Sequence, residues 1–394
     1  MEFVLVRMAN ESRKETELSV QNLELGADRI ESSPATGEKA PRFHGGNVRA
    51  AALRYGVDEK RIIDFSSSVN PLGPSSSAKR AVKKALSDIG RYPDPDSTDL
   101  RKAIARYFGI KAEQIVCGNG SSGLIHLIPR VFRPGKVLVP VPTFTEYAAA
   151  VEDAGGEVVP LVLNEKDGFR VDPVELAFAL KGVEMAFLCN PNNPTGRLIP
   201  KQEMEEIVEY AVRNNVRLVV DEAFMDFNDS DSIIKKAVQT SHLVCIRSFA
   251  EFFGMPGLRI GYAVSDETTI AAIRKGQEPW TVSLPAERAA IAALNDWSHS
   301  KKTRRLNEKE RDRLLSALRL MPGVEPFQPS ADFIFIKIKS IDATALTDQL
   351  GFRGLLVRDC SSFPGLENGY IRVGVRTRRE NKRLVKALRE LLIR

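Results

Sequence analysis

The chain has 394 residues, 43% hydrophobic and 27% charged, which is the balance of a soluble globular protein with a sizeable core. The net charge of +6 is spread over helical patterns that mix acids with bases, such as SKKTRRLNEKERDRLL, so we expect no nucleic-acid partner. No apolar run reaches membrane-spanning length and no signal peptide is recognisable, so we expect a cytoplasmic protein without membrane contact.

The first predicted elements are an N-terminal extension and a helix. Residues 1–40 are rich in Glu, Ser and Lys and show no hydrophobic period, so we expect them to be poorly ordered. From residue 97, the segment STDLRKAIARYFG has apolar residues on one helical face. We expect a helix that is capped by Ser97 or Thr98 and ends at Gly109.

Short apolar runs then alternate with helical segments. The runs are QIVC, KVLVP, EVVPLVL, MAFLC, RLVVD, LVCI and IGYAV. This rhythm predicts an α/β fold with a seven-stranded, mainly parallel sheet in a large domain over residues 41–295. A long charged helix, FIFIKIK, GLLVRD, YIRVGV and a final amphipathic helix then predict a smaller α+β domain over residues 296–394. The alternation in FIFIKIK predicts a half-exposed strand.

The four cysteines bear on redox and metal chemistry. Each closes a short apolar run, and the sequence contains neither a CxxC motif nor a Cys/His cluster. We therefore expect buried free thiols and no metal site. The four are Cys117, Cys189, Cys245 and Cys360.

Polar motifs follow several of the predicted strands, where ligands of open α/β sheets bind. CGNGSSG opens a helical segment, so its backbone N–H groups could bind an anion, although a plain tight turn explains it equally well. NPNNPTG, at residues 190–196, is too particular for an ordinary Asn/Pro/Gly turn. RLVVD ends at Asp221, and SFAEFFGMPGLRIGY supplies Ser248 and Arg259.

In this order the motifs resemble those of fold-type-I pyridoxal-phosphate enzymes, the aminotransferase class I/II group, over about residues 42–394. The resemblance implies pyridoxal 5′-phosphate as cofactor, with Asp221 at the pyridinium nitrogen, Asn193 at the phenolic oxygen and Phe144 stacked on the ring. It implies a homodimer, in which Tyr92 would reach the partner's cofactor phosphate. The residues that would hold that phosphate within the chain are Ser121, Ser122, Ser248 and Arg259.

Finer matches resemble the threonine-phosphate decarboxylases of cobalamin biosynthesis, which are close to histidinol-phosphate aminotransferases. They are HGGN, RIIDFSSSVNPLGP, RYPDPD, PTFTEY, DEAFMDF and LLVRDCSSFPGLENGYIRVGVRT. Phe224 favours the decarboxylase branch, because the aminotransferases usually have tyrosine there. The resemblance implies that Arg358 and Arg372 bind the two anionic groups of a small phosphorylated amino acid, with His44 and Asn70 at its phosphate end. The alternative is that both arginines are surface strand residues.

One position departs from the family. The loop should read Ser-x-x-Lys, with a lysine that forms a Schiff base with the cofactor, but Glu251 stands there while Ser248, Pro256 and Arg259 keep the family spacing. A carboxylate cannot condense with an aldehyde, so we expect non-covalent cofactor and impaired catalysis. We expect Glu251 either to be neutralised by a raised pKa or to turn toward Arg259. Gly123 also replaces an acid that the family usually has.

The sequence leaves three interpretations open. The first is an impaired decarboxylase that converts L-threonine O-3-phosphate to aminopropanol phosphate. The second is a histidinol-phosphate-type aminotransferase, and the third is a non-catalytic protein that binds the cofactor or another ligand. Lysine and glutamate codons can differ by one base, so the sequence fits both a recent or artificial change at residue 251 and a naturally weakened homologue.

Overall fold

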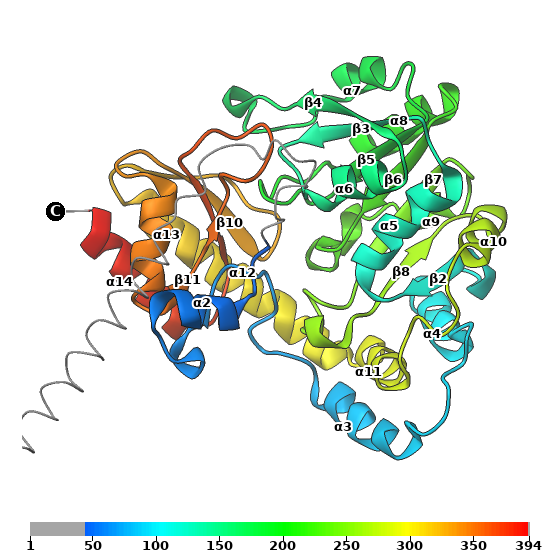
Figure 1. Ribbon diagram of the computed structural model, residues 1–394, viewed down its shortest axis with the longest axis horizontal. Coiled ribbons are helices and arrows are strands. Elements are labelled where there is room, and N and C mark those ends of the chain that lie inside the picture. Colours follow the sequence, from blue (N-terminus) through cyan, green and yellow to red (C-terminus); the bar gives the residue numbers. More distant parts are fainter. Residues whose placement is uncertain (1–43, 393–394) are drawn as a thin grey trace, which may run out of the picture. The chain divides into compact units, whose positions relative to one another are not determined.

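The computed structural model describes residues 44–392 (Figure 1). The extension that we expect over residues 1–40 lies outside this range. Within residues 44–392, no helix is long and apolar enough to cross a membrane. The four cysteines are buried and unpaired, so the prediction of free thiols is confirmed.

A seven-stranded sheet forms the centre of the larger region, and each predicted apolar run is one of its strands. Strand β8 is antiparallel to both of its neighbours and the other pairings are parallel, so the predicted mainly parallel sheet is confirmed. Across the sheet the order is β2 (Ile115–Gly118), β8 (Gly261–Val264), β7 (Leu243–Ser248), β6 (Arg217–Asp221), β5 (Met185–Cys189), β3 (Lys136–Val141) and β4 (Glu157–Val162).

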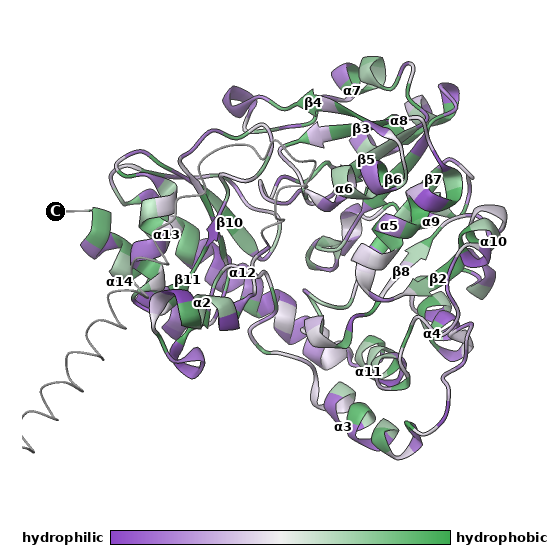
Figure 2. Ribbon diagram, viewed as in Figure 1, coloured by the Kyte–Doolittle hydropathy of each residue, from purple (hydrophilic) through white to green (hydrophobic). Residues whose placement is uncertain are grey.

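Helices cover both faces of this sheet, which explains why its strands read as continuous apolar runs. Along β6, Leu218 and Val220 pack into one hydrophobic core, whereas Val219 points to the core on the opposite face. In Figure 2 the strands are mainly green, and the surrounding helices mix green with purple. The helices of this region are α3 (Ser76–Ala85), α4 (Thr98–Phe108), α5 (Gly120–Phe132), α6 (Glu146–Asp153), α7 (Pro173–Ala179), α8 (Lys201–Arg213), α9 (Ile234–Ala237), α10 (Glu267–Lys275) and α11 (Leu284–Leu294).

The predicted helix after residue 97 is α4, and it ends at Gly109 as predicted, with that glycine in the left-handed conformation (φ 66°). Its N-terminal cap differs from the prediction. Ser97 makes no side-chain cap bond. Instead, Oδ2 of Asp94 accepts a hydrogen bond from the backbone N–H of Thr98 at 2.8 Å.

The C-terminal region is built on a four-stranded antiparallel sheet, in the order β12 (Arg358–Asp359), β13 (Tyr370–Gly374), β10 (Phe333–Ile338) and β9 (Val324–Pro326). Its helices are α12 (Trp297–Arg319), α13 (Ala343–Gly351) and α14 (Arg378–Leu392). The prediction that FIFIKIK is half-exposed was wrong, because β10 is almost entirely buried. Ile334 and Ile336 pack into the core of this region, while Phe335 packs into the core of the larger region.

The first described residues pack against this C-terminal region rather than against the large sheet. Strand β1 (Ile63–Asp64) pairs in parallel with β11 (Leu355–Leu356). Helix α2 (Val48–Tyr55) contacts α13 through Arg54, whose Nη2 lies 2.8 Å from Oδ1 of Asp348. The first described residues are therefore part of the C-terminal region of the fold.

Candidate active site

The pocket that contains most of the predicted site residues has a volume of about 460 Å³ and opens between the carboxyl ends of the large sheet's strands and the C-terminal sheet. Its position is the one expected for ligands of open α/β sheets, and its volume suits a small organic ligand. The predicted site residues that line it are His44, Ser121, Ser122, Phe144, Asn193, Asp221, Glu251, Arg259, Arg358 and Arg372. Ser248, Asn70 and Tyr92 are not among its lining residues.

One end of the pocket is an anion-binding cup at the N-terminus of α5. The first turn of this 13-residue helix carries Ser121 and Ser122 into the pocket lining, where backbone N–H groups are free of helical partners. The guanidinium group of Arg259 lies so close to Gly120 that a Cβ atom there would collide with it. The cup therefore combines hydroxyl groups, a helix N-terminus and one cation.

The Asp221 carboxylate lies at the end of β6 and accepts two hydrogen bonds. Tyr147 donates its hydroxyl to Oδ2 at 2.8 Å, and the backbone N–H of Ala223 donates to Oδ1 at 3.0 Å. Burial raises the pKa of Asp221 to about 6 in spite of these bonds. A cationic ligand group beside it would relieve that cost and lower the pKa.

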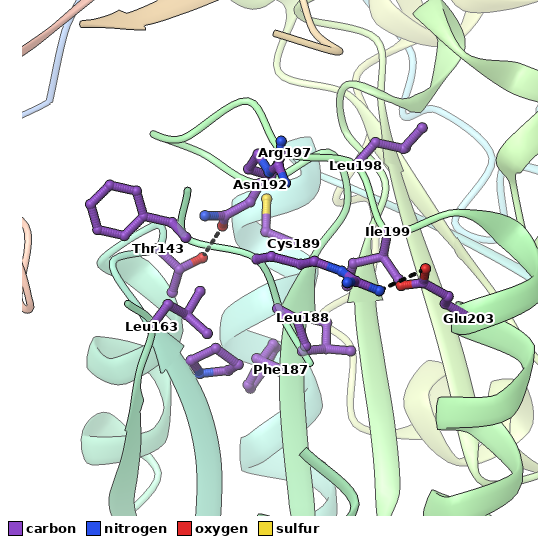
Figure 3. A pocket seen from close by; sticks show the side chains of 14 residues that line it. Thr143, Leu163, Phe187, Leu188, Cys189, Asn192, Arg197, Leu198, Ile199 and Glu203 are labelled. Carbon is purple, nitrogen blue, oxygen red and sulfur yellow. Dashed lines mark hydrogen bonds and ion pairs between the residues drawn. The ribbon is translucent and has the colours of Figure 1, made fainter. Parts of the chain in front are cut away.

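Asn193 is held in the pocket lining by the rigid turn that the NPNNPTG motif predicts. Asn192 is fixed from two sides: its Oδ1 accepts from the Thr143 hydroxyl at 2.7 Å, and its Nδ2 donates to the Pro142 carbonyl at 2.9 Å. Figure 3 shows the first of these bonds beside a second cavity of about 20 Å³, which has room for about one water molecule. Asn193 itself accepts a hydrogen bond from Arg372.

Arg358 and Arg372, which are paired across β12 and β13, also line the pocket. They are 8% and 6% exposed, so the alternative that they are surface residues was wrong. Arg358 donates to Oγ of Ser362 at 2.9 Å, and Arg372 donates to the Ser66 carbonyl at 2.7 Å. Burial lowers the pKa of both guanidinium groups, and Nε of Arg372 is buried without a partner among the described residues. Two buried cations with spare donors predict an anionic ligand.

Asn70 and Ser248 form hydrogen bonds close to Glu251. The Asn70 amide donates to the Phe252 carbonyl and to Oγ1 of Thr303, both at 2.9 Å. The Ser248 hydroxyl accepts from the backbone N–H of Ala250 at 3.0 Å. The roles of both residues in ligand binding stay predictions. Both residues hold the loop that carries Glu251, since the backbone N–H of Asn70 also donates to the Glu251 carbonyl at 2.9 Å.

His44 and Tyr92 are both exposed, but only His44 lines the pocket. His44 lines the pocket, and its Nε2 lies 3.0 Å from Oε1 of Glu146. Tyr92 is 81% exposed, and its ring lies 4.8 Å from that of Trp280. Within one chain, Tyr92 therefore lies outside the pocket that its predicted role concerns.

Two acidic residues near the site were missed by the sequence analysis. Glu146 lines the pocket and lies between His44 and His126, 2.9 Å from Nε2 of the latter. The PTFTEY motif contains Glu146, but nothing in its spacing indicated this contact. Asp332 is buried, both of its carboxyl oxygens lack partners among the described residues, and burial raises its pKa to about 7. No sequence signal marked it.

Glu251 also lines the pocket. Its Oε2 is buried and has no hydrogen-bond partner in the described part of the chain. Burial raises the pKa of Glu251 to about 7, and the charges of Asp332 and Asp221 act in the same direction. Among the described residues it forms no ion pair with Arg259, so the structure agrees with the raised-pKa expectation.

Residues 60–388 match the family described as aminotransferase class I and II, and the chain belongs to this family. Its fold is that of the fold-type-I pyridoxal-phosphate-dependent enzymes. It is 34% identical over 351 residues to threonine-phosphate decarboxylase of Salmonella typhimurium, covering 89% of this chain and 96% of the relative. It is 36% identical over 335 residues to histidinol-phosphate aminotransferase 2 of Archaeoglobus fulgidus, covering 84% and 94%.

Two solved structures give the same pair of activities. L-threonine-O-3-phosphate decarboxylase from Porphyromonas gingivalis matches with a TM-score of 0.75 and 27% identity over 84% of this chain and 99% of that one. Histidinol-phosphate aminotransferase from Clostridium acetobutylicum matches with a TM-score of 0.79 and 30% identity over 83% and 98%. The predicted family is confirmed, and both of its branches are similar to this chain.

Proposed function

We propose that this protein is a threonine-phosphate-decarboxylase-like member of the family, which binds pyridoxal 5′-phosphate non-covalently and is impaired because Glu251 replaces the catalytic lysine. Its reaction would convert L-threonine O-3-phosphate to aminopropanol phosphate in cobalamin biosynthesis. The observation that carries the proposal is one pocket whose lining combines an anion cup, a buried carboxylate and two buried arginines.

The residues of the pocket fit the cofactor. Its phosphate would be held by the α5 N-terminus with Ser121, Ser122 and Arg259, and the close approach of Arg259 to Gly120 supports this. Asp221 would hold a protonated ring nitrogen, which agrees with a carboxylate that lacks a cationic partner. When bound, the protonated ring withdraws the electron pair that remains after the substrate loses its carboxylate.

The substrate would bind with its phosphate and carboxylate on Arg358 and Arg372. A monoanionic amino acid would leave one buried guanidinium group unpaired, which is costly. His44, braced by Glu146, would add a donor at the pocket mouth. The proposed specificity therefore depends on the number of negative charges that the substrate carries rather than on its shape.

Glu251 would change the chemistry in two ways. It cannot bind the cofactor covalently, and it offers a carboxyl group where proton transfer needs an amine. A positioned acid–base group is typically worth about 10²- to 10⁴-fold in rate. The pKa of Glu251, about 7, leaves it able to exchange a proton near neutral pH, so some turnover remains.

We also propose a cytoplasmic homodimer, with a boundary between large and small domains near residue 295. The exposed ring of Tyr92 beside Trp280 supports a partner surface there. The boundary would fall between α11 and α12.

The second candidate is a histidinol-phosphate-type aminotransferase, which the similarity to that branch supports. Phe224 argues against it: this residue lines the pocket with a ring 5.0 Å from that of Phe333 and has no hydroxyl to offer a ligand. The third candidate is a binding protein without catalysis, which Glu251 favours.

Calorimetry with the cofactor-loaded protein tests the proposed substrate class. Phosphothreonine should bind at least about 10-fold more tightly than threonine, because threonine leaves a buried arginine unpaired. It should also bind more tightly than histidinol phosphate, which lacks the carboxylate. Preference for histidinol phosphate would favour the aminotransferase, and equal affinity for all three would contradict both.

A further inference from the structure

The pocket is lined by side chains of both charges. Arg259, Arg358 and Arg372 line it together with Asp221 and Glu251. Among residues 44–392, no lysine lines this pocket. A ligand that matches this lining carries anionic groups for the guanidinium groups and a positive group for the carboxyl groups.

We propose that the pocket selects the amine form of the cofactor, pyridoxamine 5′-phosphate, over the aldehyde form, and that Glu251 is the residue that binds its ammonium group. This inference rests on the proposed cofactor site. It adds a preference that follows from this chain's own residue 251.

The unpartnered oxygen of Glu251 is the first support. Oε2 is buried in the pocket wall without a donor from the described residues, so a donor from the ligand would remove the cost of burying it. An ammonium group offers three N–H donors and a charge, which makes charge-assisted hydrogen bonds to a carboxylate strong. An aldehyde offers only an acceptor oxygen, which an ionised carboxylate repels.

The surroundings of Glu251 act in the same direction. Asp221 from β6 and Asp332 from the segment before β10 raise its pKa through their negative charges, and Ser248 from β7 is a hydrogen-bonding neighbour that lowers it. The charge of Arg372 from β13 lowers the pKa of Asp332. An ammonium group would therefore enter a region where carboxyl groups predominate.

The backbone at Glu251 is held in place before any ligand binds. Asn70 fixes the Glu251 carbonyl with its backbone N–H, and its side-chain amide fixes the next carbonyl, that of Phe252. A group held in this way loses little conformational freedom when it binds a ligand. The loop that carries Glu251 is therefore already ordered for binding the ammonium group.

Three cofactor forms that differ only at the 4′ carbon provide the test. Calorimetry at pH 8, where Glu251 is mostly ionised, should give at least about 10-fold tighter binding of pyridoxamine 5′-phosphate than of pyridoxine 5′-phosphate, whose 4′ hydroxyl is neutral, and of pyridoxal 5′-phosphate. At pH 6 the preference should shrink, because Glu251 is then mostly protonated.

Variants assign the preference to one residue. Glu251→Gln should bind all three forms with affinities within about 3-fold of one another, and Glu251→Lys should favour the aldehyde form. Equal binding of the three forms by the unsubstituted protein would overturn this inference and leave the proposed cofactor site intact. Binding of none of them would overturn both. The affinity ratios of the three cofactor forms are measured on the unsubstituted protein, so they test the inference even if a variant fails to fold.

Discussion

Arg358 and Arg372 are directly paired across strands β12 and β13, and the side chains of both line the same pocket. Two buried cations on neighbouring strands repel each other, and the charge of Arg358 contributes to the lowered pKa of Arg372. An anionic ligand between them removes this cost. The pair is the strongest argument for a substrate with two negative groups.

Substitution of Arg358 and substitution of Arg372 should affect ligand binding and stability differently. Arg358→Gln should weaken phosphothreonine binding at least about 10-fold with little loss of stability, because Arg358 donates to a single side chain among residues 44–392. Arg372→Gln should weaken binding and also destabilise the fold, since Arg372 holds the Ser66 carbonyl and Asn193. Calorimetry and denaturant unfolding separate the two effects.

A matched control for both variants is Arg213→Gln, on an exposed part of α8, where the side chain pairs with Glu209. It should change neither binding nor stability measurably. Equal loss of phosphothreonine affinity in this control would mean that net charge rather than the pocket decides binding.

Replacing Gly120 by alanine should weaken phosphate binding in the cup, whereas replacing Gly257 should not. Gly120→Ala should weaken binding of the cofactor phosphate at least about 10-fold, because its Cβ would collide with the Arg259 guanidinium and Gly120 has a φ of +73°. Gly257 lies two residues before Arg259 and has open space around the position of a Cβ atom, so Gly257→Ala should bind normally. Fluorescence titration with pyridoxine 5′-phosphate measures both, and normal binding by Gly120→Ala would contradict the proposed cup.

The raised pKa of Glu251 predicts a pH-dependent cost of folding. Its folded pKa, about 7, lies above the ordinary 4.5, so the folded state binds its proton more tightly. The associated stability is present below about pH 4.5 and is lost as pH rises to about 7. Glu251→Gln should therefore lose less stability than the unsubstituted protein between pH 5 and pH 7.5, measured by urea unfolding.

An exposed glutamate provides the comparison for this experiment. Glu206→Gln, on the outer face of α8, should leave the pH dependence unchanged. If Glu251→Gln behaves in the same way, the Glu251 carboxyl is not buried as described. Burial also raises the pKa of Asp332 to about 7. Asp332 should therefore account for part of the stability that Glu251→Gln still loses as the pH rises.

Asn70 should act through the loop rather than through the ligand. Asn70→Ala removes two buried side-chain hydrogen bonds and should cost about 1–3 kcal/mol in the free energy of unfolding. Thr303→Val removes only one of these bonds and should cost less. Saturating cofactor should restore part of the Asn70→Ala loss, and unchanged stability would show that Asn70 is not a loop anchor.

The strands and the family were predictable because their signals are local. Buried parallel strands appear in the sequence as short apolar runs. The segment NPNNPTG combines Asn, Pro and Gly in an order that is unusual for an ordinary turn. The sequence does not show where side chains point. Asn70 and Ser248 keep the family spacing, but their hydrogen bonds beside Glu251 depend on contacts that the motifs do not encode. β10 alternates in sequence, yet two different cores bury its two faces.

The measurement that tests the central claim most directly is the rate of threonine-phosphate decarboxylation by Glu251→Lys compared with the unsubstituted protein. The restored amine should bind pyridoxal 5′-phosphate covalently and raise the rate at least about 100-fold, because a positioned acid–base group alone is worth that much. A variant that holds the cofactor covalently on residue 251 but decarboxylates no faster would contradict the claim that this pocket is a decarboxylase site impaired at one residue.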